Sequence, residues 1–126
     1  MDLRKKILLV DDDADTIEFL TYNFQKSGFA IVSARDGNEG IEVAKETNPD
    51  IIIADVMMPQ LNGIEMCRRI KHEKKFESLP FIFLSASGNE NHFLSAMLAG
   101  TNYYEMKPIH FFHLRERVRE VLGDTE

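Results

Sequence analysis

The sequence lacks several features that would place the protein in a specialised class. Its 126 residues include one cysteine, Cys67, so no internal disulfide can form. No apolar run approaches the ~20 residues that a membrane-spanning helix needs. The basic residues 4–6 precede only four apolar residues, which are too few for a secretory signal segment. These absences argue against a membrane protein or a disulfide-bonded scaffold, and we expect a cytoplasmic protein.

Basic residues are too scarce for a nucleic-acid-binding surface. The chain has 15 Lys and Arg against 21 Asp and Glu, which gives a net charge of −6. Because affinity for phosphate backbones comes mostly from Lys and Arg, we expect no direct binding to nucleic acid. The sequence has no internal repeat, linker or low-complexity segment, and its length suits one compact domain. With 44% hydrophobic and 29% charged residues, a packed globular core is expected.

Strand-like and helix-like patterns alternate five times along the chain. Short apolar runs predict strands at about 7–11, 30–34, 51–55, 81–85 and 103–106. Apolar residues at helical spacing lie between and after them, most clearly at residues 111–122. Parallel strands joined by helices that cover both faces form a doubly wound sheet. The sequence therefore predicts an α/β fold with a five-stranded parallel sheet and five helices.

Helix starts are marked by capping residues. An acceptor side chain stands three residues before a glutamate at Asp36 with Glu39, Asn62 with Glu65, and Ser87 with Glu90. In this pattern, the first side chain accepts a hydrogen bond from the backbone N–H at the start of a helix. We therefore expect helices to begin just after residues 36, 62 and 87.

Polar residues stand at the ends of four of the predicted strands. These are Asp11 and Asp12, Asp55, Ser85 and Lys107, separated by at least 22 residues from one strand end to the next. Each gap is long enough for a helical crossover between parallel strands. The carboxyl ends of such strands meet at one edge of the sheet, where open α/β sheets bind ligands. We expect three carboxylates, a hydroxyl and an ammonium to converge there.

Three carboxylates in one crevice need a cation. Two like charges ~4 Å apart repel by ~4 kcal/mol at an effective dielectric constant of 20. The candidate ligands Asp11, Asp12 and Asp55 offer only oxygen, which favours a hard divalent ion such as Mg²⁺. A bound metal would turn the local potential positive and attract a phosphoryl group. Lys107 would add a point charge and Ser85 a hydroxyl donor.

Five motifs, in this order and strand context, resemble the receiver domain of bacterial two-component response regulators. They are Val10-Asp11-Asp12-Asp13, Ile53-Ala54-Asp55-Val56-Met57-Met58-Pro59, Asn62-Gly63, Leu84-Ser85-Ala86 and Tyr104-Glu105-Met106-Lys107-Pro108. The resemblance covers the whole chain, so residues 1–126 are expected to form a single receiver domain. It implies the flavodoxin-like fold of chemotaxis regulators, with strand order 2-1-3-4-5.

The resemblance also implies a role for each residue of the site. Asp55 is the phospho-acceptor, whose carboxylate attacks a phosphohistidine and becomes an acyl phosphate. The metal, Mg²⁺ or alternatively Mn²⁺, is bound by Asp55 and Asp12 directly, by Asp11 through water and by the backbone carbonyl of Met57. Lys107 contacts the phosphoryl group. The peptide bond between it and the next residue, Pro108, is typically cis in relatives.

Two further residues resemble the parts that transmit the signal. Ser85 resembles the hydroxyl that swings toward the phosphoryl group, and Tyr104 the aromatic residue that then turns inward. Their movement changes the surface formed by the helix between the strands at 81–85 and 103–106, by the strand at 103–106 and by the helix at 111–122. Met57 takes the place of the amide or acid that orients the hydrolytic water in fast relatives, so we expect a long-lived phosphate.

The resemblance implies a phosphorylation-controlled signalling switch that catalyses only its own phosphorylation and dephosphorylation. A sensor histidine kinase or a phosphotransfer protein would supply the phosphoryl group, and a downstream protein or attached effector domain would receive the signal. Two alternatives are an aspartyl-nucleophile phosphohydrolase and a non-phosphorylated binding module of the same fold, such as a pseudo-receiver or a flavin-binding protein. The sequence leaves open the kinase, the stimulus, the output, the oligomeric state and whether the chain is a stand-alone receiver or part of a longer regulator.

Overall fold

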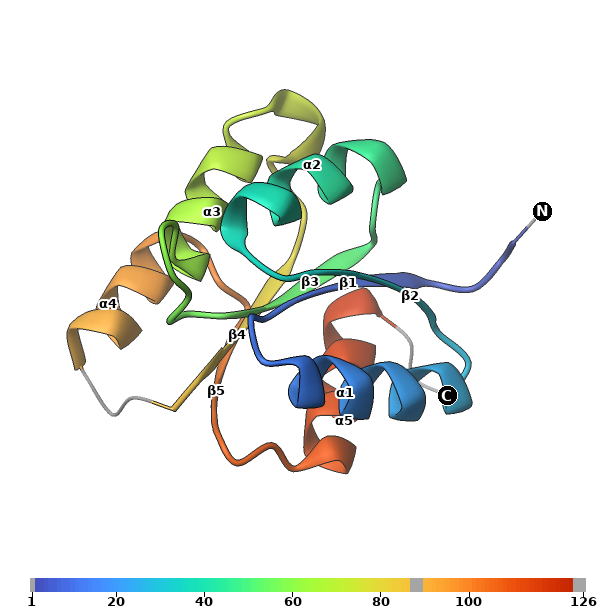
Figure 1. Cartoon of the computed structure of the whole chain (residues 1–126). Coiled ribbons are helices and arrows are strands. Elements are labelled where there is room, and N and C mark those ends of the chain that lie inside the picture. Colours follow the sequence, from blue (N-terminus) through green and yellow to red (C-terminus); the bar gives the residue numbers. More distant parts are fainter. Residues whose placement is uncertain (1, 87–89, 124–126) are drawn as a thin grey trace.

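The computed structural model describes residues 2–86 and 90–123, and Figure 1 shows its architecture. Within these residues, the strands are β1 (Lys6–Val10), β2 (Ala30–Ala34), β3 (Ile51–Asp55), β4 (Phe81–Ser85) and β5 (Tyr103–Met106). They form one sheet in the order β2-β1-β3-β4-β5, and every neighbouring pair is parallel. The predicted doubly wound α/β fold and its strand order are confirmed.

Helices cover both faces of the sheet. They are α1 (Ala14–Lys26), α2 (Gly37–Thr47), α3 (Gly63–Lys71), α4 (Glu90–Leu98) and α5 (Phe111–Leu122), with a short 3-10 helix, η1 (Lys74–Phe76), after α3. Figure 1 shows α2, α3 and α4 on one face, and α1 and α5 on the other. The five helices match the prediction, and η1 adds one turn that was not predicted. None of the helices in the described part is long and apolar enough to cross a membrane.

The core consists of one layer on each face of the sheet. Side chains alternate between the two faces along each strand, so neighbouring residues of β3 belong to different layers. Ile52 and Ala54 pack with residues of α2, α3 and α4, while Ile51 and Ile53 pack with residues of α1 and α5. All five residues of β3 are buried. Asp55, the last of them, is therefore held by a strand that has no solvent-facing side.

The first strand begins and ends one residue earlier than the predicted 7–11. Lys6 already pairs with Ala30 of β2, and the register continues to Val10 opposite Ala34. The backbone N–H of Asp11 still donates to the Ala34 carbonyl, at 3.2 Å, and the chain then turns away. Asp11 thus stands just past the end of β1.

The predicted caps fall at helix starts. Asp36 accepts a hydrogen bond from the N–H of Glu39, and Asn62 accepts one from the N–H of Glu65, both at 2.8 Å. Each bond satisfies an N–H of the first turn that has no partner within its own helix. The third predicted cap, Ser87, lies outside the described residues. Helices α2 and α3 therefore begin where the sequence predicted.

Candidate functional site

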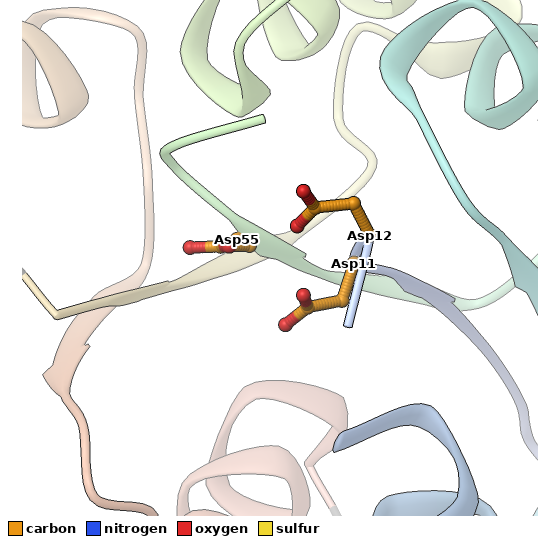
Figure 2. A group of neighbouring side chains, drawn as sticks. All are labelled: Asp11, Asp12 and Asp55. Atoms are coloured by element: carbon orange, nitrogen blue, oxygen red, sulfur yellow. The ribbon is translucent and has the colours of Figure 1, made fainter. Parts of the chain in front are cut away.

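The polar residues at the strand ends meet at one edge of the sheet. Asp11 and Asp12 follow β1, Asp55 ends β3, and each offers a carboxylate oxygen within 4.8 Å of the other two. Figure 2 shows the three side chains extending toward the same side from neighbouring strand ends. The predicted convergence of the carboxylates is present in the fold.

The β3–α3 loop leaves Asp55 little freedom to move. The N–H of Val56 donates to the Leu84 carbonyl at 2.9 Å, which extends the pairing of β3 with β4 past Asp55. The N–H of Gly63 donates to the Val56 carbonyl at 3.0 Å and closes the loop. A Cβ atom on Gly63 would lie 2.3 Å from the Asp55 carbonyl oxygen. The backbone of Asp55 therefore depends on glycine at position 63.

Asp11 is held at both of its carboxylate oxygens. It is 2% exposed, and Oδ1 accepts a hydrogen bond from the N–H of Asp13 at 2.9 Å. Oδ2 lies 3.1 Å from the ammonium nitrogen of Lys107. Asp12, in contrast, is exposed. The two neighbouring carboxylates thus differ, since one is fixed within the protein and the other faces solvent at the mouth of the site.

Lys107 brings an ammonium group to two of the three carboxylates. Its Nζ lies 3.1 Å from Asp11 Oδ2 and 3.6 Å from Asp55 Oδ2. Although burial opposes the charged form, the two carboxylates raise the pKa of Lys107 above its ordinary value. Its N–H donates to the Ser85 carbonyl at 2.8 Å, and its peptide bond to Pro108 is cis, as expected. The backbone of Lys107 is thus tied to the end of β4, and its ammonium lies beside the Asp55 carboxylate.

Asp55 is the most perturbed carboxyl group of the site. Burial and the neighbouring Asp11 carboxylate raise the pKa of Asp55 to about 6, although Lys107 opposes this change. Burial disfavours the charged carboxylate by desolvation, and the Asp11 carboxylate adds a repulsion that the Lys107 ammonium does not offset. The all-oxygen donor set and this residual charge fit a hard divalent cation. Asp11, Asp12 and Asp55 are the side chains that would hold it.

Met57 follows Asp55 by two residues in the β3–α3 loop. Its backbone N–H lies 3.4 Å from Asp55 Oδ1, and its side chain is half exposed. The structure therefore places the backbone of Met57 beside the Asp55 carboxylate. The role of its carbonyl as a metal ligand remains a prediction.

Ser85 and Tyr104 occupy neighbouring strands behind the site. Ser85 ends β4 and is fully buried. Tyr104 of β5 packs against the core on the side of α4, with its ring 5.4 Å from that of Phe93. Among the described residues, the buried Tyr104 hydroxyl has no hydrogen-bond partner.

Sequence reasoning missed Arg35. This residue directly follows β2, and its Nη2 donates to the backbone carbonyl of Asp12 at 3.2 Å. The strand-end rule that identified Asp11, Asp55 and Lys107 applies equally to β2 and would have identified Arg35. Its partner is a backbone atom, however, and no side-chain motif marks such a contact.

Comparison with known proteins identifies relatives along the chain. The family model described as "Response regulator receiver domain" matches residues 7–119. The alkaline phosphatase synthesis transcriptional regulatory protein PhoP of Bacillus subtilis (strain 168) is 34% identical over 124 residues, which cover 98% of this chain and 51% of that protein. The chain thus spans about half the length of this curated relative.

Solved structures show the same fold. A putative response regulator from Chloroflexus aurantiacus J-10-fl superposes with a TM-score of 0.90 at 29% identity, covering 95% of this chain and 98% of that chain. The chemotaxis protein CheY4 of Vibrio cholerae gives a TM-score of 0.89 at 24% identity, with 94% and 98% covered. At that identity the second comparison supports the fold alone.

Proposed function

This chain belongs to the response regulator receiver domain family of two-component systems, and from that membership we propose that it is a switch controlled by phosphorylation of Asp55. Receiver domains act as signalling switches rather than as classical enzymes. The observation that carries the proposal is the convergence of three carboxylates within 4.8 Å beside an ammonium 3.6 Å from Asp55 Oδ2. We propose no separate catalytic activity.

The phosphoryl donor in this proposal is a phosphohistidine of a sensor histidine kinase or a phosphotransfer protein. A carboxylate oxygen of Asp55 attacks the phosphorus, and the P–N bond breaks as the P–O bond forms. The leaving imidazole is neutral because the other nitrogen of the phosphohistidine ring already carries a proton. The product is an acyl phosphate on Asp55. The proposal requires Asp55 to be ionised, which its pKa of about 6 allows at neutral pH.

The other charged residues would organise this transfer. Lys107 would pair with an oxygen of the phosphoryl group in place of its present carboxylate partners, Asp11 and Asp55. Asp11, Asp12, Asp55 and the Met57 carbonyl would hold Mg²⁺, or alternatively Mn²⁺. When bound, the ion supplies positive charge that stabilises the phosphoryl oxygens during transfer. Asp11 stays anchored by the Asp13 N–H while Lys107 turns to the phosphate.

The output of the switch would be a changed surface. Ser85 would turn its hydroxyl to the phosphoryl group, and Tyr104 would move in response and alter the face formed by α4, β5 and α5. We propose that this face is read by a downstream protein or by an effector domain of the same polypeptide, since a relative of about twice this length exists. With a net charge of −6, the chain itself is proposed to bind neither nucleic acid nor membranes and to act in the cytoplasm.

Beryllofluoride, which mimics an aspartyl phosphate, tests the switch without turnover. With Mg²⁺ present, we expect its addition to shift backbone amide resonances at Met57 and also in α4 and β5. Asp55→Asn serves as the matched control and should not respond. Shifts confined to the metal site would contradict a signalling role and favour a simple binding module of the same fold.

A further inference from the structure

The two loops that border the acidic site are joined by a hydrogen bond between a side chain and the backbone. Arg35, in the β2–α2 loop, donates from Nη2 to the carbonyl of Asp12, 23 residues earlier, at 3.2 Å. We infer that Arg35 is a positioning residue that orients Asp12 for the divalent cation and thereby sets the affinity of the site. This inference rests on the proposed function, because it presumes that the cation binds there.

Asp12 depends on this contact more than its neighbours depend on theirs. Asp11 is restrained by the Asp13 N–H at 2.9 Å and by Lys107 at 3.1 Å. Asp55 is restrained by its buried strand. Among the described residues, no hydrogen bond reaches the Asp12 carboxylate, and the side chain is exposed. Its direction is therefore set through its own backbone. The peptide unit that follows Asp12 is held at its carbonyl by Arg35 and at its N–H by the Asp11 carboxylate.

Arg35 is itself supported by the start of α2. Its backbone N–H donates to Oε1 of Glu39, while Asp36 accepts from the Glu39 N–H at 2.8 Å. This reciprocal arrangement resembles a capping box and fixes the residue before the helix. Because the base of the side chain is held, the guanidinium loses less conformational freedom when it reaches Asp12. The cap of α2 and the orientation of Asp12 are thus linked.

The charge of Arg35 acts against its proposed role, which makes the inference testable. The guanidinium contacts the Asp12 backbone and repels an incoming Mg²⁺, so removing its charge alone should strengthen metal binding. Loss of the hydrogen bond should weaken it. Salt separates the loss of repulsion from the loss of the hydrogen bond. At 1 M ionic strength the Debye length falls to about 3 Å, so the repulsion between Arg35 and Mg²⁺ is screened. The hydrogen bond from Arg35 to the Asp12 carbonyl persists.

The experiment is a Mg²⁺ titration of the unphosphorylated protein, followed by backbone amide resonances near the site, in about 1 M KCl and again in about 10 mM KCl. At high salt, Arg35→Ala should weaken Mg²⁺ binding about threefold or more, as expected for the loss of one hydrogen bond. At low salt the loss should shrink. Arg35→Lys keeps a charged donor and should retain more affinity than Arg35→Ala at high salt.

Two controls make the titration specific. Lys5→Ala removes an equal charge next to the amino end of β1, away from the site, and should leave the high-salt affinity unchanged. Glu39→Ala removes the support beneath Arg35 and should weaken binding in the same direction, by a smaller factor. Thermal melting of each variant without metal confirms that the fold is intact.

The outcomes separate this inference from the proposed function. If the parent binds Mg²⁺ and Arg35→Ala binds it equally or more tightly at high salt, the positioning role is wrong while the metal site stands. If the parent shows no Mg²⁺ binding, both fail. If weaker binding is accompanied by an equal loss in Lys5→Ala, the effect is general and the inference is overturned.

Discussion

The ammonium nitrogen of Lys107 lies 3.6 Å from Oδ2 of Asp55, and this contact joins the loop after β5 to the last residue of β3. It does not neutralise the site, because three carboxylates share the edge of the sheet. The pKa of Asp55 stays raised, to about 6, through burial and the charge of Asp11. Because of these surroundings, the ionised form of Asp55 at neutral pH is less favourable than that of an exposed carboxylate.

This excess charge should be visible as a pH-dependent loss of stability. The carboxyl of Asp55 titrates at about 6 in the folded state against 3.8 as its ordinary value, so the folded state binds the proton more tightly. Stability from this group is present below pH 3.8 and is lost as the pH rises toward 6. We expect Asp55→Asn to raise the free energy of unfolding by about 1–2 kcal/mol at pH 7 without metal.

Urea unfolding at pH 3.5 and pH 7 measures this difference. The parent and Asp55→Asn should have similar free energies of unfolding at pH 3.5, and Asp55→Asn should be the more stable at pH 7. Saturating Mg²⁺ should reduce this difference in stability at pH 7. A gap of the same size at both pH values would show that the substitution acts through packing and not through charge.

A substitution at Gly63 tests how tightly the backbone of Asp55 is packed. In Gly63→Ala the new Cβ would lie 2.3 Å from the Asp55 carbonyl oxygen, a backbone atom that cannot turn aside. We expect a loss of about 1–3 kcal/mol in the free energy of unfolding, together with slower labelling of Asp55 by acetyl phosphate. Gly28→Ala is the matched control, because its strain comes from a φ of 97° with nothing within 4 Å. It should lose stability and keep the labelling rate.

Ser85 should couple the phosphoryl group to the outer surface. Its hydroxyl is buried at the end of β4, one strand away from Tyr104. We expect Ser85→Ala to keep the beryllofluoride-induced amide shift at Met57 and to reduce the shifts in α4 and β5. Ser85→Thr retains the hydroxyl and should preserve them. Full shifts in Ser85→Ala would mean that the signal travels by another route.

Met57 should lengthen the life of the phosphate. Its thioether cannot donate a hydrogen bond and accepts one only weakly, so it cannot orient an attacking water, and its bulk shields the phosphorus. We expect Met57→Asn to accelerate loss of the Asp55 phosphate about tenfold, or ~1.4 kcal/mol in activation free energy. Met57→Leu, of similar bulk and without an amide, should decay at the parent rate. The measurement is phosphoprotein decay by mass spectrometry after the donor is removed. An unchanged rate in Met57→Asn would show that another group limits hydrolysis.

Much of the site could be predicted because it depends on the backbone topology. A buried strand such as β3 is a continuous apolar run, and its end is marked in the sequence by Asp55. Once the strands are parallel, their ends share one edge whatever the details of packing. Asp11, Asp55 and Lys107 follow from that rule alone. The order of the strands does not follow from that rule, because hydrophobic patterns do not indicate which strands are neighbours. The predicted order came from the family resemblance.

The contacts that sequence reasoning missed depend on how far side chains reach between elements. Arg35 holds a backbone carbonyl, which has no residue signature. Glu105 of β5 pairs with His113 of α5 at 2.9 Å, and Tyr103 bonds to Glu120 of the same helix. These pairs fix how α5 lies against β5. They depend on the rotation of the helix about its axis, which apolar spacing defines only to within a face.

The raised pKa of Asp55 could not be predicted from the sequence either, because it arises from burial as well as from charge. The motif indicates that three carboxylates are close, and it says nothing of the 7% exposure of Asp55 against the open position of Asp12. Desolvation depends on the whole surrounding fold. Because desolvation raises the pKa of Asp55 to about 6, the charge of this carboxyl group changes near neutral pH.

The most direct test of the account is the labelling of the protein by acetyl phosphate, located by peptide mass spectrometry. We predict that a single phosphoryl group appears on Asp55 in the presence of Mg²⁺ or Mn²⁺, and that chelation of the metal abolishes it. Asp15→Asn, which removes an exposed carboxylate from the first turn of α1, should label like the parent. Labelling that survives Asp55→Asn, or that is indifferent to chelation, would contradict the account.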